Sequence, residues 1–316
     1  MIKKYFLQIL IVLLLIGIAW ALLLIKSDNK PIQANINQSQ GDKTISKLPN
    51  SNDIDNKFFP IRNWSVEEPE IFAKSAIVLS FRNDRKDSAL FQKNINQVLP
   101  IASLTKLMTA IIAIENYDPE TIVKVSKEAI SVDSTNGGLI DGEKLKTKDL
   151  LYIMLVESSN DAAMSLAKDN PQMTYDDFIF KMNNKARELG LKNTSFVEPA
   201  GLDSYNQSTV SEIAILAEYA FKFPLLAEIL KTPETTIYSI DKSVIHKITS
   251  TNKLLGKIPQ LIGGKTGFTE EAGGCLMTIS KIYDDNYLIT VILGSTQREN
   301  DTEKLIDWTQ NAWIWQ

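Results

Sequence analysis

The sequence contains very few of the side chains that bind metals or form disulfides. Its 316 residues include one cysteine, Cys275, and one histidine, His246. A single cysteine excludes an intramolecular disulfide, and together with a single histidine it argues against a zinc site. Carboxylates could still hold calcium or magnesium, but we expect no metal and no cofactor. We interpret His246 as incidental to catalysis and Cys275 as a small residue that packs within a strand.

The chain also lacks an excess of positive charge. It has 34 Lys and Arg residues against 38 Asp and Glu residues, which gives a formal net charge of −4 at pH 7. An acidic balance argues against nucleic acid as a partner. With 44% hydrophobic and 23% charged residues the composition is that of a globular protein, and the length suits one large domain or two small ones.

One long hydrophobic run lies at the N-terminus. Residues 5–25 are apolar except for Gln8. About 20 apolar residues are enough to cross a bilayer as a helix, so we predict that residues 1–26 form a transmembrane anchor. The alternative is a cleaved signal peptide followed by secretion, because Ala19 and Ala21 have the spacing of a cleavage site. The apolar run continues past that site, which favours the uncleaved anchor.

A polar segment follows this run. Residues 27–65 are rich in Asn, Gln, Ser, Asp and Lys and show no sustained periodicity. Such a segment buries too little apolar area to offset the entropy of ordering it, so we predict a flexible tether. We expect the folded domain to cover residues 66–316.

Strand patterns lie at both ends of this domain, and helical patterns lie between them. The expected strands are residues 75–81, 88–93, 264–268, 275–282 and 287–293. The expected helices are residues 103–115, 148–157, 161–168, 178–189, 210–221 and 303–313. We expect hairpin turns at residues 273–274 and 284–286. The pattern predicts an α+β fold, in which both ends of the domain form one antiparallel sheet flanked by helices, with an all-helical lobe inserted at about residues 105–235.

Three short motifs carry residues suited to catalysis. They are Ser103-Leu104-Thr105-Lys106, Ser158-Ser159-Asn160 and Lys265-Thr266-Gly267. Each motif is common by chance, since Ser-x-x-Lys is usually an N-cap serine followed by a solvated lysine. Their order, and their expected positions at a helix start, a helix-helix turn and a strand, make a joint chance match a poor explanation.

The first motif could form an activated nucleophile with lysine in place of histidine. Lys106 lies three residues after Ser103, so both face the same side of a helix. A lysine acts as a base only when it is neutral, and the helix N-terminus, desolvation and a second cation, Lys265, all disfavour its charge. The N–H of Ser103 could stabilise an oxyanion. This arrangement suits nucleophilic catalysis in a chain with one histidine.

The other two motifs could handle protons and substrate. A hydroxyl at Ser158 could relay a proton to a leaving amine, and the Asn160 amide could hold a substrate carbonyl or orient the lysine of the first motif. Lys265 and Thr266 could bind a carboxylate on a strand edge, where an extended peptide can pair. Gly267 leaves room for close approach of a backbone.

The sequence around these motifs closely resembles the D-alanyl-D-alanine carboxypeptidases, which are low-molecular-mass penicillin-binding proteins. The resemblance covers roughly residues 73–308, and the motifs that carry it extend over residues 102–110, 159–163, 265–269 and 272–273. Serine β-lactamases share the three-motif set. The resemblance implies a penicillin-binding protein/β-lactamase-like fold.

The resemblance also implies roles for individual residues. Ser103 would be the acylated nucleophile, Lys106 its proton acceptor and Ser158 the second catalytic residue. The substrate-binding residues would be Asn160, Lys265, Thr266, Gly267, Phe268 and Arg298. The N–H of Phe268 would be a second oxyanion donor. Arg298 would hold the terminal carboxylate of the substrate, which its planar guanidinium matches; the alternative is a surface ion pair with Glu299 or Glu303.

These roles imply a serine D,D-carboxypeptidase that removes the terminal D-alanine of peptidoglycan stem peptides and reacts covalently with β-lactams. Because peptidoglycan lies outside the cell membrane, the anchor would place the catalytic domain on the extracytoplasmic side. Three alternatives remain. They are a D,D-endopeptidase of the same fold, a β-lactamase with Glu198 as the base for deacylation, and an inactive protein that binds wall peptides, against which the intact motifs argue.

Overall fold

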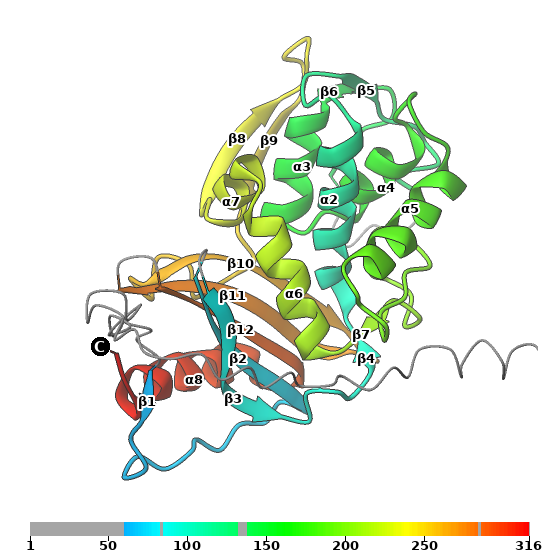
Figure 1. The fold of residues 1–316 in the computed structure, drawn as a ribbon. Helices are drawn as coiled ribbons and strands as arrows, with labels where there is room; N and C mark the ends of the chain where they lie inside the picture. Colours follow the sequence, from blue (N-terminus) through cyan, green and yellow to red (C-terminus); the bar gives the residue numbers. More distant parts are fainter. Residues whose placement is uncertain (1–59, 83–84, 132–137, 284–285, 316) are drawn as a thin grey trace, which may run out of the picture. The chain divides into compact units, whose positions relative to one another are not determined.

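The computed structural model describes residues 60–82, 85–131, 138–283 and 286–315, and all of these belong to one compact unit (Figure 1). A five-stranded antiparallel sheet forms one part of this unit, in the order β10-β11-β12-β2-β3. Its strands are β2 (Ser75–Arg82), β3 (Arg85–Lys93), β10 (Leu261–Thr269), β11 (Gly273–Tyr283) and β12 (Asn286–Ser295). The predicted α+β fold, with a sheet built from both ends of the domain, is confirmed.

Alternation along the strands assigns each side chain to one face of the sheet. Ile289 and Val291 of β12 join the larger hydrophobic core, which includes α6 (Val210–Phe221). Leu288 and Ile292 of the same strand pack instead against α8 (Arg298–Ala312). α6 and α8 therefore lie on opposite faces of the sheet, as Figure 1 shows.

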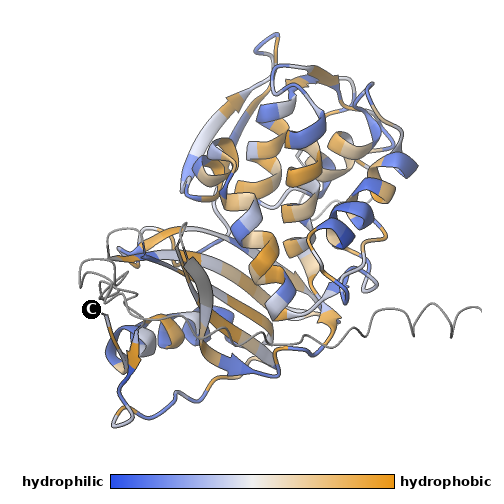
Figure 2. Ribbon diagram, in the orientation of Figure 1, coloured by the Kyte–Doolittle hydropathy of each residue, from blue (hydrophilic) through white to orange (hydrophobic). Residues whose placement is uncertain are grey.

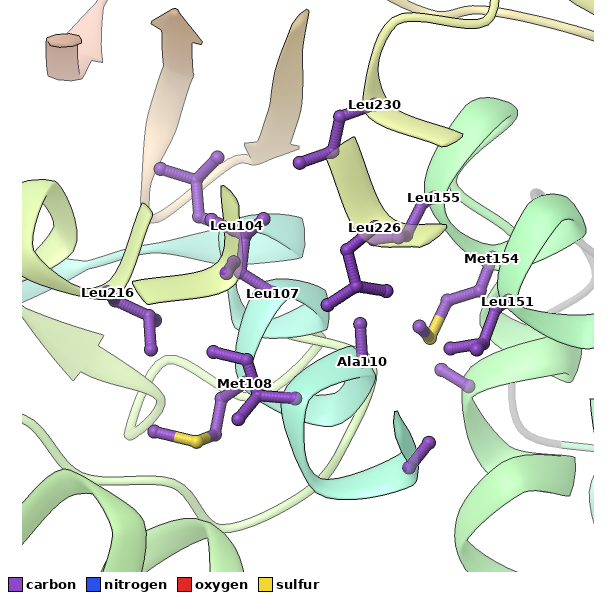
Figure 3. Packing of buried hydrophobic residues seen from close by; sticks show 14 of the residues in the cluster. Leu104, Leu107, Met108, Ala110, Leu151, Met154, Leu155, Leu216, Leu226 and Leu230 are labelled. Carbon is purple, nitrogen blue, oxygen red and sulfur yellow. The ribbon is translucent and has the colours of Figure 1, made fainter. Parts of the chain in front are cut away.

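The second part of the unit is a helical lobe between β3 and β10. It contains α2 (Thr105–Asn116), α3 (Thr147–Val156), α4 (Asn160–Lys168), α5 (Tyr175–Glu188) and α7 (Pro224–Leu230). Every residue of α2 from position 105 to 113 is buried, so this helix is central. The apolar side chains of α2, α3 and α7 meet in one core (Figure 3), whereas hydrophilic residues gather on the outside of α5 (Figure 2).

Several elements were not expected from the sequence. They are α7, the hairpin of β8 (Glu234–Tyr238) and β9 (Ile245–Thr249), and the short pairs β1–β13 (Ile61–Arg62, Trp313–Ile314), β4–β7 (Leu99–Pro100, Gln207–Ser208) and β5–β6 (Ile122–Lys124, Lys144–Lys146). Most of these strands have two or three residues, too few for a periodic pattern. The described fold also begins before residue 66, because β1 pairs with the C-terminal β13.

The turn between β10 and β11 differs from the expected one. It consists of residues 270–272, and Gly273 and Gly274 are instead the first residues of β11. Gly273 has a φ of 66°, which favours glycine, and a Cβ on Gly274 would lie 2.6 Å from the carbonyl oxygen of Ser295. These glycines therefore permit close packing of strands and do not form the turn itself.

The predicted single-pass membrane location is contradicted by the part of the chain that the structure describes. No helix within these ranges is both long and apolar enough to cross a bilayer. The longest of them, α8, has 15 residues, whereas a span needs about 20 residues, nearly all apolar. The run at residues 5–25, on which the prediction depended, lies outside the described residues.

Candidate active site

The first motif forms a tight turn followed by a buried helix. Ser103 lies in a 3₁₀ turn, Ala102–Leu104, and α2 begins at the next residue. Ala102 has a φ of 47°, an unusual value for a residue with a Cβ. Strained backbone of this kind persists only where the surroundings enforce it. Here the turn holds Ser103 at the N-terminal end of α2, as the sequence predicts.

The side chain of Lys106 is fully buried and reaches the serine hydroxyl. Its Nζ lies 2.9 Å from Oγ of Ser103, 2.8 Å from Oδ1 of Asn160 and 2.6 Å from the carbonyl oxygen of Ala200. A buried amine requires such oxygen partners, because burial removes it from water. The expected reach from Lys106 to Ser103 is present, and so is the contact to Asn160.

The second motif connects α3 to α4. Ser158 has a φ of 69°, and Ser159 caps α4 by accepting a hydrogen bond of 3.2 Å from the N–H of Ala162. The left-handed backbone at Ser158 turns its side chain toward β10, where Nζ of Lys265 donates to Oγ of Ser158 at 2.8 Å. The site thus contains two serine-lysine pairs, Ser103 with Lys106 and Ser158 with Lys265.

Lys265 lies within the interior of the site. It exposes only 1% of its surface, and besides Ser158 it donates to the carbonyl oxygen of Thr266 at 2.9 Å. Burial lowers the pKa of Lys265 well below its usual value, and the positive charges of Lys106 and Arg298 lower it further. Lys265 therefore releases its proton more readily than a lysine in water, as a group that transfers protons requires.

The third motif lies on β10, at an edge of the sheet. A Cβ on Gly267 would lie 3.0 Å from the backbone nitrogen of Ser103 and 3.1 Å from the carbonyl oxygen of Ile101, so β10 packs tightly against the nucleophile turn at this glycine. The hydroxyl of Thr266 lies 2.5 Å from that of Thr251. Phe268 exposes 61% of its surface, beside the accessible edge of the strand.

Arg298 forms one of the two contacts that the sequence leaves open, the ion pair with Glu299. It is the first residue of α8, and one guanidinium nitrogen donates to the carbonyl oxygen of Gly267 at 2.7 Å. Its Nε forms an ion pair with Glu299 at 2.9 Å. Glu303 pairs instead with Lys257. Arg298 therefore lies against β10 and supplies positive charge next to the third motif.

Glu198 does not face the nucleophile as a deacylating base would. Its carboxylate accepts hydrogen bonds from the backbone N–H groups of Ala200 at 2.6 Å, Gly201 at 2.5 Å and Leu202 at 2.7 Å, and from the side chain of Asn206. These bonds satisfy its oxygens within its own loop. The β-lactamase alternative therefore loses the residue on which it depended.

Two contacts of the site could not be found from sequence. The carbonyl oxygen of Ala200 contacts Lys106 although the residues are 94 positions apart, and Thr251 supports Thr266 through a hydroxyl pair. A backbone carbonyl has no signature in the residue type, and a single threonine is too common to select.

Of the two rare residues, His246 pairs with a carboxylate and Cys275 lies on the strand beside the third motif. Nε2 of His246 lies 3.0 Å from Glu143 in the buried junction between β9 and the loop before β6. Cys275 is buried in β11 opposite Gly267, and burial raises the pKa of its thiol to about 11. Cys275 is thus a packed strand residue, as the sequence indicates.

Comparison with known proteins agrees with this geometry. Residues 62–297 match the peptidase S11 family model, described as D-alanyl-D-alanine carboxypeptidase. The chain is 32% identical to a D-alanyl-D-alanine endopeptidase of Pseudomonas aeruginosa, over 78% of this chain and 80% of that protein. It is 33% identical to the D-alanyl-D-alanine carboxypeptidase DacF of Bacillus subtilis, over 75% of this chain and 61% of that protein.

Solved structures show the same fold. The DD-transpeptidase of Streptomyces K15 superposes with a TM-score of 0.71 at 29% identity, covering 78% of this chain and all of that one. A penicillin-binding protein homolog of Mycobacterium tuberculosis gives a TM-score of 0.70 at 26% identity, covering 79% of this chain and 95% of that one. With its two serine-lysine pairs at the edge of this sheet, the chain belongs to the D-alanyl-D-alanine carboxypeptidase family of serine peptidases, peptidase S11.

Proposed function

We propose that the chain removes the terminal D-alanine from peptidoglycan stem peptides through an acyl-enzyme on Ser103. The observation that carries this proposal is the pair of buried lysines, each within 2.9 Å of a serine hydroxyl. A buried amine next to a hydroxyl is the arrangement of an activated nucleophile that needs no histidine.

In the acylation step, Oγ of Ser103 attacks the carbonyl carbon of the penultimate D-alanine while Lys106 accepts the hydroxyl proton. The negative charge that develops on the carbonyl oxygen is held by the N–H groups of Ser103 and Phe268. The close approach of Gly267 to the backbone of Ser103 supports this pairing of donors from two elements.

In the breakdown step, the bond between the carbonyl carbon and the leaving nitrogen breaks, and Ser158 supplies a proton to the departing D-alanine. Lys265 replaces that proton, since its Nζ donates to Ser158 at 2.8 Å. The proton on Lys106 then returns to Lys265. Water attacks the ester carbonyl, Lys106 takes a proton from the water and passes it to Oγ of Ser103, and the bond between the carbonyl carbon and Oγ breaks to release the carboxylate product. The lowered pKa of Lys265 supports its role in this proton transfer.

The substrate would bind as an added strand on the free edge of β10. Asn160 would hold a substrate carbonyl, and Thr266 and Arg298 would bind the terminal carboxylate. Arg298 is suited to this because its guanidinium already lies on the backbone of Gly267.

The test is covalent labelling with a fluorescent penicillin, together with D-alanine release from a D-Ala-D-Ala peptide. Ser103→Ala should abolish both while the melting temperature stays within a few degrees of the wild type. Ser243→Ala, an exposed serine in the β8–β9 turn, is the matched control and should leave both unchanged. Labelling that persists in Ser103→Ala would place the nucleophile elsewhere.

A D,D-endopeptidase is the second candidate, because endopeptidases are among the relatives that match along most of their length. Those of Pseudomonas aeruginosa and Escherichia coli are 32% and 30% identical, each over 80% of its length. Mass spectrometry of a muropeptide digest separates the two functions. A carboxypeptidase converts pentapeptides to tetrapeptides and releases D-alanine, whereas an endopeptidase converts cross-linked dimers to monomers.

A further inference from the structure

The oxygens around Lys106 differ in what they can do. Oδ1 of Asn160 and the carbonyl oxygen of Ala200 can only accept hydrogen bonds, whereas the hydroxyl of Ser103 can also donate. A neutral amine has two hydrogens and one lone pair. If the two acceptor oxygens take the two hydrogens, the lone pair points to the hydroxyl of Ser103, which is the geometry that a general base needs.

The peptide bond between Ala200 and Gly201 is held from both sides. Its carbonyl oxygen lies 2.6 Å from Nζ of Lys106, and its N–H donates to Oε1 of Glu198 at 2.5 Å. In a trans peptide these two groups point in opposite directions within one plane. Glu198 therefore fixes the plane of the peptide bond whose oxygen contacts the lysine, and its charge polarises that bond.

Two further contacts fix the position of this loop. The hydroxyl of Thr109, one turn along α2 from Lys106, donates to the carbonyl oxygen of Pro199 at 2.7 Å. A Cβ on Gly201 would lie 2.0 Å from the carbonyl oxygen of Ala102, so the loop rests directly on the nucleophile turn. Small rotations of the loop would consequently change the contact between Ala200 and Lys106.

We propose that Glu198 is a positioning residue that acts through Lys106. It holds the carbonyl oxygen of Ala200 against Nζ, so that this oxygen and Asn160 take the two amine hydrogens and leave the lone pair for Ser103. The inference rests on the proposed roles of Ser103 and Lys106. It gives Glu198 a function in acylation, although its carboxylate is directed into its own loop.

The test is a double-mutant cycle with Glu198→Gln and Lys106→Ala, in which the acylation rate by benzylpenicillin is followed by intact mass. Glutamine keeps the shape of the side chain but replaces one acceptor oxygen with an NH2 group, which cannot accept from a backbone N–H. We expect Glu198→Gln to lower the acylation rate about 100-fold, since a misplacement of about 1 Å can cost that much. In the Lys106→Ala background it should change the residual rate less than about 3-fold, because its effect passes through the lysine.

The matched control is Asp203→Asn in the same loop. Its carboxylate accepts from the N–H of Tyr205 at 2.8 Å and not from the peptide of Ala200, so the acylation rate should remain at the wild-type value. If Glu198→Gln does not fold, Glu198→Asp keeps the charge, shortens the side chain by one methylene and enters the same cycle. The proposal would be overturned if the Glu198 variant acylates at the wild-type rate. It would also be overturned if the Glu198 substitution lowers the acylation rate by the same factor with and without Lys106.

These outcomes differ from a failure of the proposed function. Labelling that survives in Ser103→Ala would remove the nucleophile and with it the wider proposal. If labelling depends on Ser103 but the effects of the Glu198 and Lys106 substitutions on the acylation rate are additive, only the role of Glu198 is removed.

Discussion

Burial sets the chemistry of the two lysines in this site. Lys106 and Lys265 expose 0% and 1% of their surface, and each contacts a serine hydroxyl. In water a lysine is protonated and cannot serve as a base near neutral pH. Desolvation lowers the pKa of Lys265, and the positive charges of Lys106 and Arg298 lower it further, so the site contains a lysine that releases its proton more readily than a lysine in water.

The first prediction concerns the base. Lys106→Arg should lower the rate of acylation by a fluorescent penicillin about 100- to 10,000-fold, because a guanidinium stays protonated and cannot accept a proton. Stopped-flow labelling of the folded variant measures this rate. A variant within about 3-fold of the wild type would exclude Lys106 as the base.

The second prediction concerns Lys265 and the stability of the fold. Its pKa is depressed in the folded state, so between that pKa and about 10.4 the unfolded chain binds more protons and the free energy of unfolding rises with pH. The destabilisation that the depressed pKa of Lys265 causes is absent above the pKa of this lysine in the unfolded chain, and it grows as pH falls below that value. Lys265→Met should therefore flatten this rise by up to about 1.4 kcal/mol per pH unit. Urea denaturation of the wild type and of Lys265→Met at pH 7 and pH 9 measures this difference. The same change in the free energy of unfolding between the two pH values in both proteins would contradict the prediction.

The third prediction concerns substrate recognition by Arg298. If Arg298 binds the terminal carboxylate, Arg298→Ala should reduce hydrolysis of a free-acid D-Ala-D-Ala peptide about 10-fold or more, the range for a hydrogen bond to a charged group. Hydrolysis of the C-terminal amide should change much less. An equal loss on both substrates would assign Arg298 to bracing Gly267 and pairing with Glu299.

At the scale of elements, the site is built where three connections meet. The turn before α2 and the turn between α3 and α4 both contain a non-glycine residue with positive φ, Ala102 and Ser158. The loop that carries Ala200 rests on the first of these turns through Gly201. Strained turns at these positions orient the nucleophile and the second serine, and the surrounding core stabilises them.

The fourth prediction tests this packing with two glycines of similar φ. Gly201 and Gly190 have φ values of 84° and 75°, but only at Gly201 would a Cβ collide with backbone, 2.0 Å from the carbonyl oxygen of Ala102. Gly190→Ala should lower the free energy of unfolding by about 1 kcal/mol through backbone strain alone. Gly201→Ala should cost several-fold more and suppress penicillin labelling. Equal costs, measured by urea denaturation, would show that the loop moves freely away from the turn.

At the scale of the whole molecule, the two ends of the domain meet in the centre of the sheet. β2 and β12 pair over seven residues, and the larger hydrophobic core contains residues of both the sheet and the helical lobe. The sheet and the helical lobe therefore share one hydrophobic core where they meet. We therefore expect the sheet and the helical lobe to unfold together.

The fifth prediction follows from where the tryptophans lie. All four in the described ranges, Trp64, Trp308, Trp313 and Trp315, belong to the region around α8 and the sheet, whereas most helices lie in the other lobe. Trp20 lies outside the described ranges, so it is replaced in a Trp20→Phe protein. In that protein tryptophan fluorescence reports on the region around α8 and the sheet, and circular dichroism at 222 nm reports mainly on the helical lobe. Because the two parts should unfold together, the urea transitions followed by these two signals should coincide. Midpoints that differ clearly would indicate two independent units.

Much of this architecture follows from sequence because its signals are local. The helix at Val210–Phe221 has the predicted bounds, and α2, α3 and α4 differ from prediction by at most two residues at either end. Long apolar periodicity and chemically distinctive motifs supply these signals. α8 begins five residues earlier than predicted, at Arg298, because its first turn is polar and its one buried carboxylate there, Asp301, bonds to the distant Phe72 and Ala73.

The sequence by itself determined the residue types of the site, the three motifs, the order of the main elements and the family resemblance. Only the tertiary structure decided which groups touch: Lys265 and Ser158 are 107 positions apart, and Ala200 reaches Lys106 with a backbone atom. It also turned Glu198 from a candidate base into a support for its own loop. The physical reason is that side-chain chemistry and periodicity are local properties of the chain, whereas burial, strand edges and backbone contacts arise only when distant segments pack together.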